Sequence, residues 1–272
     1  MKKRIFAALL AAACLAALAA CGGKDPSASS GETADLLASI QAKGEIVVAM
    51  EGTWAPWTYH NEADELVGYD VEVAQKIAEK LGVEVSFVEG EFDGLLAGLE
   101  AGRYDIMVNG VDIDEERSKK FDFSTPYAYN RTAVIVRADN EDIQSMEDLS
   151  GKHTANTITS TYAAVAEKYG AEVTGVDDLN QTFELLFSGR IDATLNAEVS
   201  YYDYLRAHPD AEIKVACLDT ETTQVAIPMR KGEETASLRE AIDKALDELA
   251  QEGVLSQLSN QYFGVDISQN QS

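Results

Sequence analysis

The chain carries one short motif twice, and this internal repeat constrains the fold more than any other feature. Gly102-Arg103-Tyr104-Asp105 is followed by Asn109, and Gly189-Arg190-Ile191-Asp192 is followed by Asn196. The two copies are therefore offset by 87 residues (189 − 102 and 196 − 109). A repeated supersecondary unit predicts two similar lobes. A helix-to-strand turn of this kind can also recur by chance, and the sequence leaves that alternative open.

Hydrophobic patterning around the two copies supports the repeat. Strand patterns alternate with amphipathic-helix patterns, and glycines follow the helices. In the first half we expect strands at Glu45–Met50, Val83–Phe87 and Asp105–Val108 and helices at Asp70–Leu81 and Phe92–Ala101. In the second half we expect strands at His153–Thr157, Val173–Val176 and Ile191–Leu195 and helices at Ser160–Tyr169 and Asp178–Phe187. This alternation predicts an α/β fold in which each lobe is a mixed, mostly parallel sheet with flanking helices.

The last part of the chain is expected to return to the first lobe through helices at Leu238–Glu252 and Leu255–Gln261. The predicted lobes are then residues 36–132 plus 227–268 and residues 133–226. Two crossings follow, near Arg131–Val136 and Thr223–Pro228, and paired crossings form a hinge that can close on a ligand. Interfaces between lobes are preferred ligand sites.

The N-terminus has the pattern of a secretory signal peptide. Three basic residues precede an uncharged, Ala- and Leu-rich run over Ile5–Ala20, which is short for a membrane span of ~20 residues. A buried N-terminal helix is the alternative. Residues 22–34 (GGKDPSASSGETA) are small and polar, so we expect residues 21–35 to be a flexible linker after removal of residues 1–20.

Charge and cysteine usage exclude several classes of protein. The chain has 22 Lys and Arg against 47 Asp and Glu, a formal charge of −25 that repels nucleic acid. If Cys14 is removed and Cys21 is modified, Cys217 is the only thiol left, so no internal disulfide is expected. The three histidines are far apart in sequence, and we expect neither a metal site nor a cofactor.

Leu18-Ala19-Ala20-Cys21 resembles the bacterial lipobox, whose cysteine is acylated and becomes the new N-terminus. The resemblance implies a protein that is anchored to the outer face of the cell membrane only through lipid at Cys21. Two or more acyl chains give stable anchoring, whereas one chain is marginal.

Six segments, in this order and spacing, resemble the family 3 extracellular solute-binding proteins, the amino-acid receptors of bacterial ABC importers. They are Gly68–Glu72, Gly102–Asp105, Gly110–Arg117, Phe121–Tyr127, Asp148–Lys152 and Tyr262–Gly264. The resemblance covers about Ile40 to Ser268. Ala155–Ala163 and Glu167–Ala171 are similar to the cystine-receptor branch. The family implies a two-lobed periplasmic-binding-protein-like fold, a small amino-acid ligand, an ABC permease partner and a monomer.

An amino-acid receptor needs a cation and amide donors for the ligand carboxylate. Arg117 matches the carboxylate-binding arginine of the family, and a guanidinium fork can hold both oxygens. The alternative is an exposed arginine paired with Glu115 or Glu116. Thr159, Ser160 and Thr161 precede or begin a predicted helix, where free N–H groups favour an anion, although simple N-capping is equally open.

Aromatic residues match the positions that enclose the ligand side chain in the family. Trp54 and Phe92 are expected to form these walls, whereas Trp57 is better explained as core. The expected ligand-binding set also includes Asn109, Gly110 and Asn196.

The chain departs from the family at the anchor for the ligand ammonium. The usual Asp of the second lobe is Ala197 here, between Asn196 and Glu198, and Asp112 stands where the family often has Thr. A buried ammonium without a counter-charge is costly, so Asp112 or Glu198 is expected to replace the missing acid. A ligand without a free α-amine and a mere surface role for Asp112 are the alternatives.

The sequence favours a binding protein over an enzyme. It has no Gly-x-Ser-x-Gly motif, and no histidine has an identifiable Ser or Cys partner. Because the fold also serves periplasmic dehydratases and ligand sensors, a cyclohexadienyl-type dehydratase and an amino-acid-sensing lipoprotein remain the alternatives.

Lipidation of Cys21 is tested by a Cys21→Ser variant in the native host. Loss of the acyl chains should move the protein from the membrane fraction to the soluble fraction. Cys217→Ser is the matched control and should stay with the membrane. An unmodified Cys21 at the mature N-terminus, detected by mass spectrometry, would contradict the prediction.

Overall fold

The structure, a computed structural model, describes residues 35–270. The signal peptide predicted at 1–20, Cys21 and the linker up to residue 34 lie outside these residues and stay predictions. The first described helix, α2 (Leu36–Lys43), begins after Asp35, whose carboxylate accepts a hydrogen bond from Ala38 N at 2.8 Å. Within residues 35–270, no helix is both long enough and apolar enough to cross a membrane.

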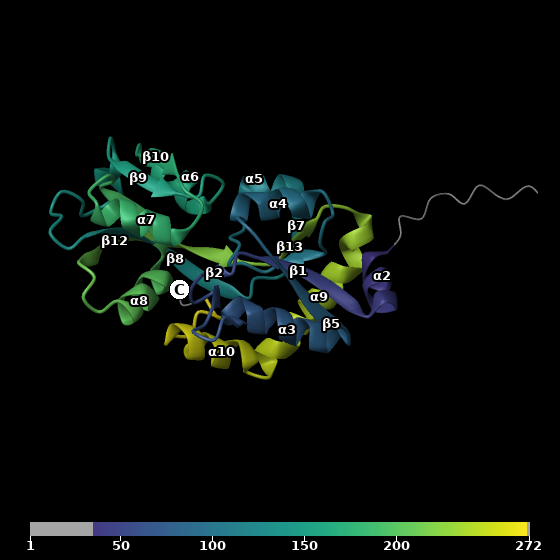
Figure 1. Cartoon of the computed structure of the whole chain (residues 1–272). Helices are drawn as coiled ribbons and strands as arrows, with labels where there is room; N and C mark the ends of the chain where they lie inside the picture. Colours follow the sequence, from purple (N-terminus) through teal and green to yellow (C-terminus); the bar gives the residue numbers. More distant parts are fainter. Residues whose placement is uncertain (1–34, 271–272) are drawn as a thin grey trace, which may run out of the picture. The chain divides into compact units, whose positions relative to one another are not determined.

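The first sheet has the strand order β5-β1-β6-β13-β7 and contains both parallel and antiparallel pairs (Figure 1). β1 pairs in parallel with β5 and β6, whereas β13 is antiparallel to β6 and β7. The strands are β1 (Glu45–Met50), β5 (Glu84–Glu89), β6 (Ile106–Met107), β7 (Phe121–Phe123) and β13 (Pro228–Arg230). A separate small sheet holds β2 (Thr53–Trp54), β3 (Thr58–His60) and β4 (Leu66–Val67).

Helices cover both faces of the first sheet. They are α3 (Tyr69–Leu81), α4 (Phe92–Glu100), α5 (Glu115–Lys120), α9 (Ala236–Gln251) and α10 (Val254–Phe263), with a short 3-10 turn at Glu233–Thr235. Alternate residues of β1 point to opposite faces. Val48 and Met50 pack in the cluster that includes residues of α3 and α9, whereas Ala49 packs with Leu95 of α4. The apolar run of β1 is therefore buried on both faces, as in other sheets covered on two sides.

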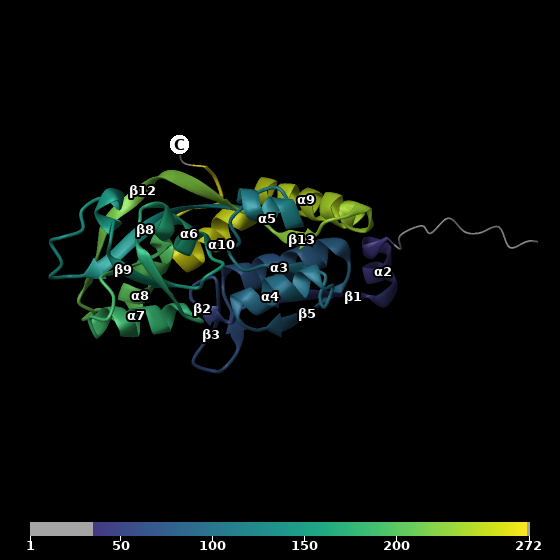
Figure 2. The ribbon, with the colours of Figure 1, turned by 90° about the horizontal axis from the view of Figure 1, so that it is seen from above.

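The second sheet has the order β10-β9-β11-β8-β12. β9 is parallel to β10 and β11, and the long strands β8 and β12 are antiparallel neighbours (Figure 2). The strands are β8 (Ala128–Arg137), β9 (His153–Asn156), β10 (Glu172–Gly175), β11 (Ala193–Ala197) and β12 (Ile213–Val225). The helices are α6 (Thr161–Lys168), α7 (Leu179–Phe187) and α8 (Glu198–Ala207), with a 3-10 turn at Met146–Leu149. The predicted two-lobed α/β fold is confirmed.

Two crossing segments join the sheets and are hydrogen-bonded to each other. Ser124 N donates to the Ile227 carbonyl at 3.0 Å, and Ile227 N donates back to Ser124 Oγ at 3.0 Å. Tyr127 N donates to the Val225 carbonyl at 2.9 Å. The outward crossing thus ends where β8 begins, a few residues before the expected position near Arg131–Val136, which lies within β8. The residue bounds proposed for the lobes stay a prediction.

Most predicted elements are present within a few residues of their expected bounds, and β1 matches fully. The sequence analysis did not predict α5, α8 or the small sheet. α5 (EERSKK) has no apolar periodicity and begins because the Asp114 carboxylate accepts the Arg117 N–H at 2.8 Å. The strands of the small sheet have two or three residues each, too few to show an alternating pattern.

Candidate functional site

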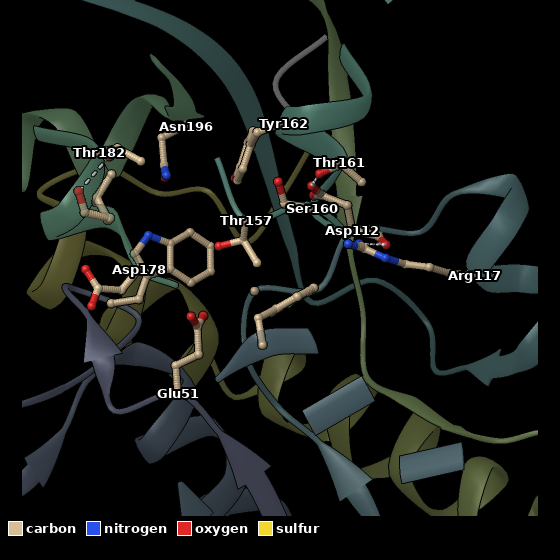
Figure 3. Close-up of a pocket in the computed structure, with 14 residues that line it drawn as sticks. Glu51, Asp112, Arg117, Thr157, Ser160, Thr161, Tyr162, Asp178, Thr182 and Asn196 are labelled. Atoms are coloured by element: carbon tan, nitrogen blue, oxygen red, sulfur yellow. Dashed lines mark hydrogen bonds between the residues drawn. The ribbon is translucent and has the colours of Figure 1, made fainter. Parts of the chain in front are cut away.

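Fourteen residues from both lobes line a pocket (Figure 3). From the first lobe, the lining residues that the sequence predicted are Trp54, Phe92, Gly110, Asp112 and Arg117. From the second lobe, they are Ser160, Thr161 and Asn196. The sequence analysis therefore brought together residues that lie far apart in the chain.

Arg117 is buried at one end of the pocket. Its Nη1 donates to the Asp112 carbonyl and its Nη2 to the Thr159 carbonyl, both at 2.9 Å, and its Nε lies 3.2 Å from Asp114 Oδ2. Its guanidinium carbon lies 5.3 Å from the centre of the Phe92 ring. A guanidinium has five N–H donors, so two remain for a ligand. The alternative of an exposed arginine paired with Glu115 or Glu116 is wrong, because Arg117 is 7% exposed and both acids pair with Lys119.

The start of α6 supplies backbone donors beside Arg117. Ser160 is the N-cap, and its Oγ accepts the Ala163 N–H at 3.1 Å. Within residues 35–270, the N–H groups of Thr161 and Tyr162 have no hydrogen-bond acceptor. Free N–H groups at the positive end of a helix favour an anion. Ser160 thus serves as a cap, while the two free amides face a site where Arg117 already concentrates positive charge.

Asp112 places a buried carboxylate next to this positive group. It is 2% exposed, and its Oδ2 accepts the Thr161 hydroxyl at 2.5 Å. Its Oδ1 makes no hydrogen bond to any described residue. Burial raises the pKa of Asp112, while the nearby hydroxyls of Thr161 and Thr223 and the charge of Arg117 act in the opposite direction. A buried carboxylate oxygen without a donor suits a cationic ligand group, and Asp112 is not a surface acid.

The other end of the pocket is acidic. In Figure 3 Glu51 and Asp178 lie on the side away from Arg117 and Asp112. Glu51 Oε2 accepts the Asn109 Nδ2–H at 2.7 Å, and Asp178 caps α7 by accepting the Gln181 N–H at 3.0 Å. The pKa of Glu51 is raised to about 7, mainly by burial; the charges of Asp178 and Asp93 act in the same direction, and the hydrogen bond from Asn109 acts against them. A cation at this end would relieve the repulsion between these acids.

Aromatic rings and a glycine shape the wall of the pocket. Trp54 and Trp57 stack with ring centres 5.4 Å apart, but only Trp54 lines the pocket. Trp57 is 1% exposed and also packs on Phe263, so it belongs to the core as expected. Gly110 has φ +54°, and a Cβ there would lie 2.6 Å from a ring atom of Trp54. Only glycine lets the ring approach the backbone this closely.

Three predicted residues lie outside the pocket lining. Asn109 accepts the Glu51 N–H and donates to the Glu51 carboxylate, both at 2.7 Å, and the Thr159 carbonyl accepts a hydrogen bond from Arg117. Glu198 is paired with Arg131, whose Nη2 lies 2.8 Å from Glu198 Oε2, and lines a different pocket. Glu198 is therefore not placed to meet the same ligand as Arg117.

The sequence analysis missed six lining residues: Glu51, Thr157, Tyr162, Asp178, Leu179 and Thr182. Glu51 directly follows β1, and ligand sites in α/β sheets lie beyond the carboxyl ends of parallel strands. The position of Glu51 could therefore have predicted it as a pocket residue. Asp178 could have been predicted for another reason, because it starts a helix that faces the same interface.

The family model described as bacterial extracellular solute-binding proteins, family 3, matches residues 46–265. The chain belongs to this family. The L-cystine-binding protein TcyA of Bacillus subtilis (strain 168) is 38% identical over 98% of this chain and 100% of its own length.

Solved structures of family 3 proteins agree with the two-lobed fold. An ancestral arginine-binding protein bound to arginine is 35% identical, covers 81% of this chain and 99% of its own, and has a TM-score of 0.75. The L-cystine solute receptor of Neisseria gonorrhoeae, in the unliganded open conformation, is 38% identical, covers 87% of this chain and 100% of its own, and has a TM-score of 0.57. The arginine-bound structure thus superposes better than the open one despite its lower identity.

A Glu51→Gln variant should show the raised pKa as a pH-dependent gain in stability. The folded protein holds the Glu51 proton more tightly than the unfolded chain, so ionisation lowers the free energy of unfolding as the pH rises from 4.5 to about 7. Glutamine removes this loss and still accepts the Asn109 hydrogen bond. Relative to wild type, we expect a gain of about 2–3 kcal/mol across this window, measured by urea unfolding. The exposed Glu100→Gln is the control, and a Glu51→Gln effect independent of pH would contradict the prediction.

Proposed function

We propose that this family 3 protein is an extracytoplasmic, lipid-anchored receptor that captures L-cystine or a related polar amino acid. The two lobes close on the ligand, and the complex delivers it to an ABC transporter permease. The proposal extends the family assignment, which covers amino-acid-binding proteins of ABC transporters.

One observation carries the choice of ligand: the pocket has a charged group for each part of a diamino acid. Arg117 and the free N–H groups of α6 suit one carboxylate, and the open oxygen of Asp112 suits the adjacent ammonium. Beyond the aromatic wall, Glu51 and Asp178 suit a second ammonium. Cystine has an ammonium group at each end, and these two groups match this arrangement, whereas its second carboxylate meets no second cationic side chain among the lining residues.

L-Arginine is the second candidate. The acidic end of the pocket would also pair with a guanidinium, and similar structures include an arginine-binding protein bound to arginine. Cystine is favoured because proteins named L-cystine-binding are 33–38% identical over most of this chain.

An enzymatic function and a sensor function have less support than the proposed transport receptor. The similar curated proteins are binding proteins, which indicates a binding role without a reaction. An ancestral amino-acid-binding protein described as a precursor of cyclohexadienyl dehydratase is 26% identical, with a TM-score of 0.76. Incubation with prephenate or arogenate should therefore give no product.

The ligand assignment is tested by calorimetric titration with L-cystine, L-arginine, L-glutamine and L-cysteine. We expect L-cystine to bind most tightly and to raise the melting temperature progressively as its concentration exceeds Kd. L-Cysteine should bind more weakly, because it lacks the second ammonium for Glu51 and Asp178. Tighter binding of L-arginine would replace cystine by the second candidate, and no binding of any of them would overturn the proposal.

Arg117→Ala should weaken L-cystine binding at least ~30-fold, since loss of one partner of a buried charge pair costs ~2–5 kcal/mol. Arg117→Lys keeps the charge but loses the fork, so it should recover only part of the affinity. Calorimetry measures both variants, and Arg103→Ala, on the exposed end of the first repeat motif, is the control. Unchanged affinity of Arg117→Ala would place the ligand carboxylate elsewhere.

Asp112→Asn should weaken binding of the free amino acid by ~2–4 kcal/mol but should change little for its N-acetyl derivative, which has no charge to pair. Calorimetry with both ligands separates charge pairing from a structural effect. Equal losses would show that Asp112 acts structurally. Glu198→Gln is the control, and a loss confined to that variant would move the ammonium anchor to the second lobe.

A further inference from the structure

Three hydrogen bonds join Thr159, in the loop before α6, and Thr161, the first residue of α6, to the first lobe. Arg117 Nη2 donates to the Thr159 carbonyl at 2.9 Å, and Thr161 Oγ1 donates to Asp112 Oδ2 at 2.5 Å. The third runs from the Thr159 hydroxyl to Asp93 Oδ1. The first two involve residues that line the pocket and would act directly on a ligand, whereas neither partner of the third does so.

The Asp93–Thr159 pair lies at the rim of the pocket. Both residues are exposed, and each is adjacent in sequence to a residue of the pocket: Asp93 follows Phe92, and Thr159 precedes Ser160. Thr159 bonds two different residues of the first lobe. Its hydroxyl donates to Asp93, and its carbonyl accepts a hydrogen bond from Arg117. The hydrogen bond between the Thr159 hydroxyl and Asp93 therefore also fixes the Thr159 carbonyl, which orients the guanidinium of Arg117.

Charge favours the same contact. Asp93 stands in the first turn of α4, and its partner Thr159 lies immediately before the N-cap of α6. A carboxylate near the positive end of a helix is stabilised, and here one carboxylate lies near two helix starts that belong to different lobes. Separation of the lobes would remove both the hydrogen bond and part of this stabilisation.

We infer that Asp93 and Thr159 form an interlobe latch, a pair of positioning residues that holds the lobes together over the bound ligand and slows its release. This inference rests on the proposed ligand-binding function. Neither residue of the latch lines the pocket, so the latch should change how long a ligand stays bound rather than which ligand is recognised.

The test is a double-mutant cycle on Asp93→Asn and Thr159→Val. Valine removes the hydroxyl but keeps the side-chain size and the carbonyl. In stopped-flow measurements with L-cystine, each single variant should raise the dissociation rate about five- to tenfold, with little change in the association rate. The double variant should be no worse than either single one, because both remove the same contact. Glu91→Gln, an exposed acid whose side chain has no partner among the described residues, is the control and should match wild type.

Two further measurements separate a latch from a general structural role and from failure of the proposed function. The melting temperatures of the variants without ligand should equal that of wild type, since the contact is exposed. Solution scattering at the same protein and ligand concentrations should show a larger radius of gyration for the variants than for wild type. If wild type binds L-cystine and the variants release it at the wild-type rate, the latch alone is overturned. If wild type binds no L-cystine, the proposed ligand fails, and scattering decides the latch: identical radii of gyration would overturn it.

Discussion

The architecture of the site depends on one buried carboxylate, that of Asp70. It is fully buried at the start of α3, where Oδ2 accepts the Gly110 N–H at 2.5 Å and Oδ1 accepts the Tyr127 hydroxyl at 2.7 Å. Gly110 lines the pocket, and Tyr127 belongs to the outward crossing and donates its N–H to Val225 of the returning one. One side chain thus links α3, the Gly110 segment of the pocket wall and the outward crossing. Burial raises the pKa of Asp70 to about 7, so near neutral pH these two donors are what hold its charge.

The pocket separates positive and negative charge although the chain is strongly acidic as a whole. Arg117 is the one cationic side chain among the lining residues, against the carboxylates of Glu51, Asp112 and Asp178. A group of acids usually marks a solvated face, but Asp112 is buried and Glu51 is removed from much of its water. One buried and two half-buried carboxylates repel one another unless a proton or a cation compensates them. This acidic lining supports the proposed ligand, which carries two ammonium groups.

The fold class and eight of the fourteen lining residues of the candidate site were predicted from the sequence, and the failures of the prediction have physical causes. Repeats and hydrophobic periodicity indicate which residues of an element are buried, so β1 and the helices around it were predicted closely. Short polar elements such as α5 form through a cap and tertiary contacts, and no period marks them. Asp112 was identified because it departs from the family pattern. Glu198 was a candidate on sequence proximity to Ala197, but at the first position of α8 it pairs with Arg131 instead.

Glu51 shows why charge in such a pocket cannot be assigned from sequence alone. Its position after β1 could be read from the sequence, but its protonation depends first on burial and then on Asn109, Asp178 and Asp93, which come from three other segments of the chain. With a pKa of about 7, a substantial fraction of Glu51 is protonated at neutral pH, and an arriving ammonium would shift it to the charged form. Binding of a cationic group at this end should therefore release a proton. The acid is neutral when protonated and negative when ionised, so the charge at this end of the pocket depends on burial and on several neighbouring groups rather than on one contact.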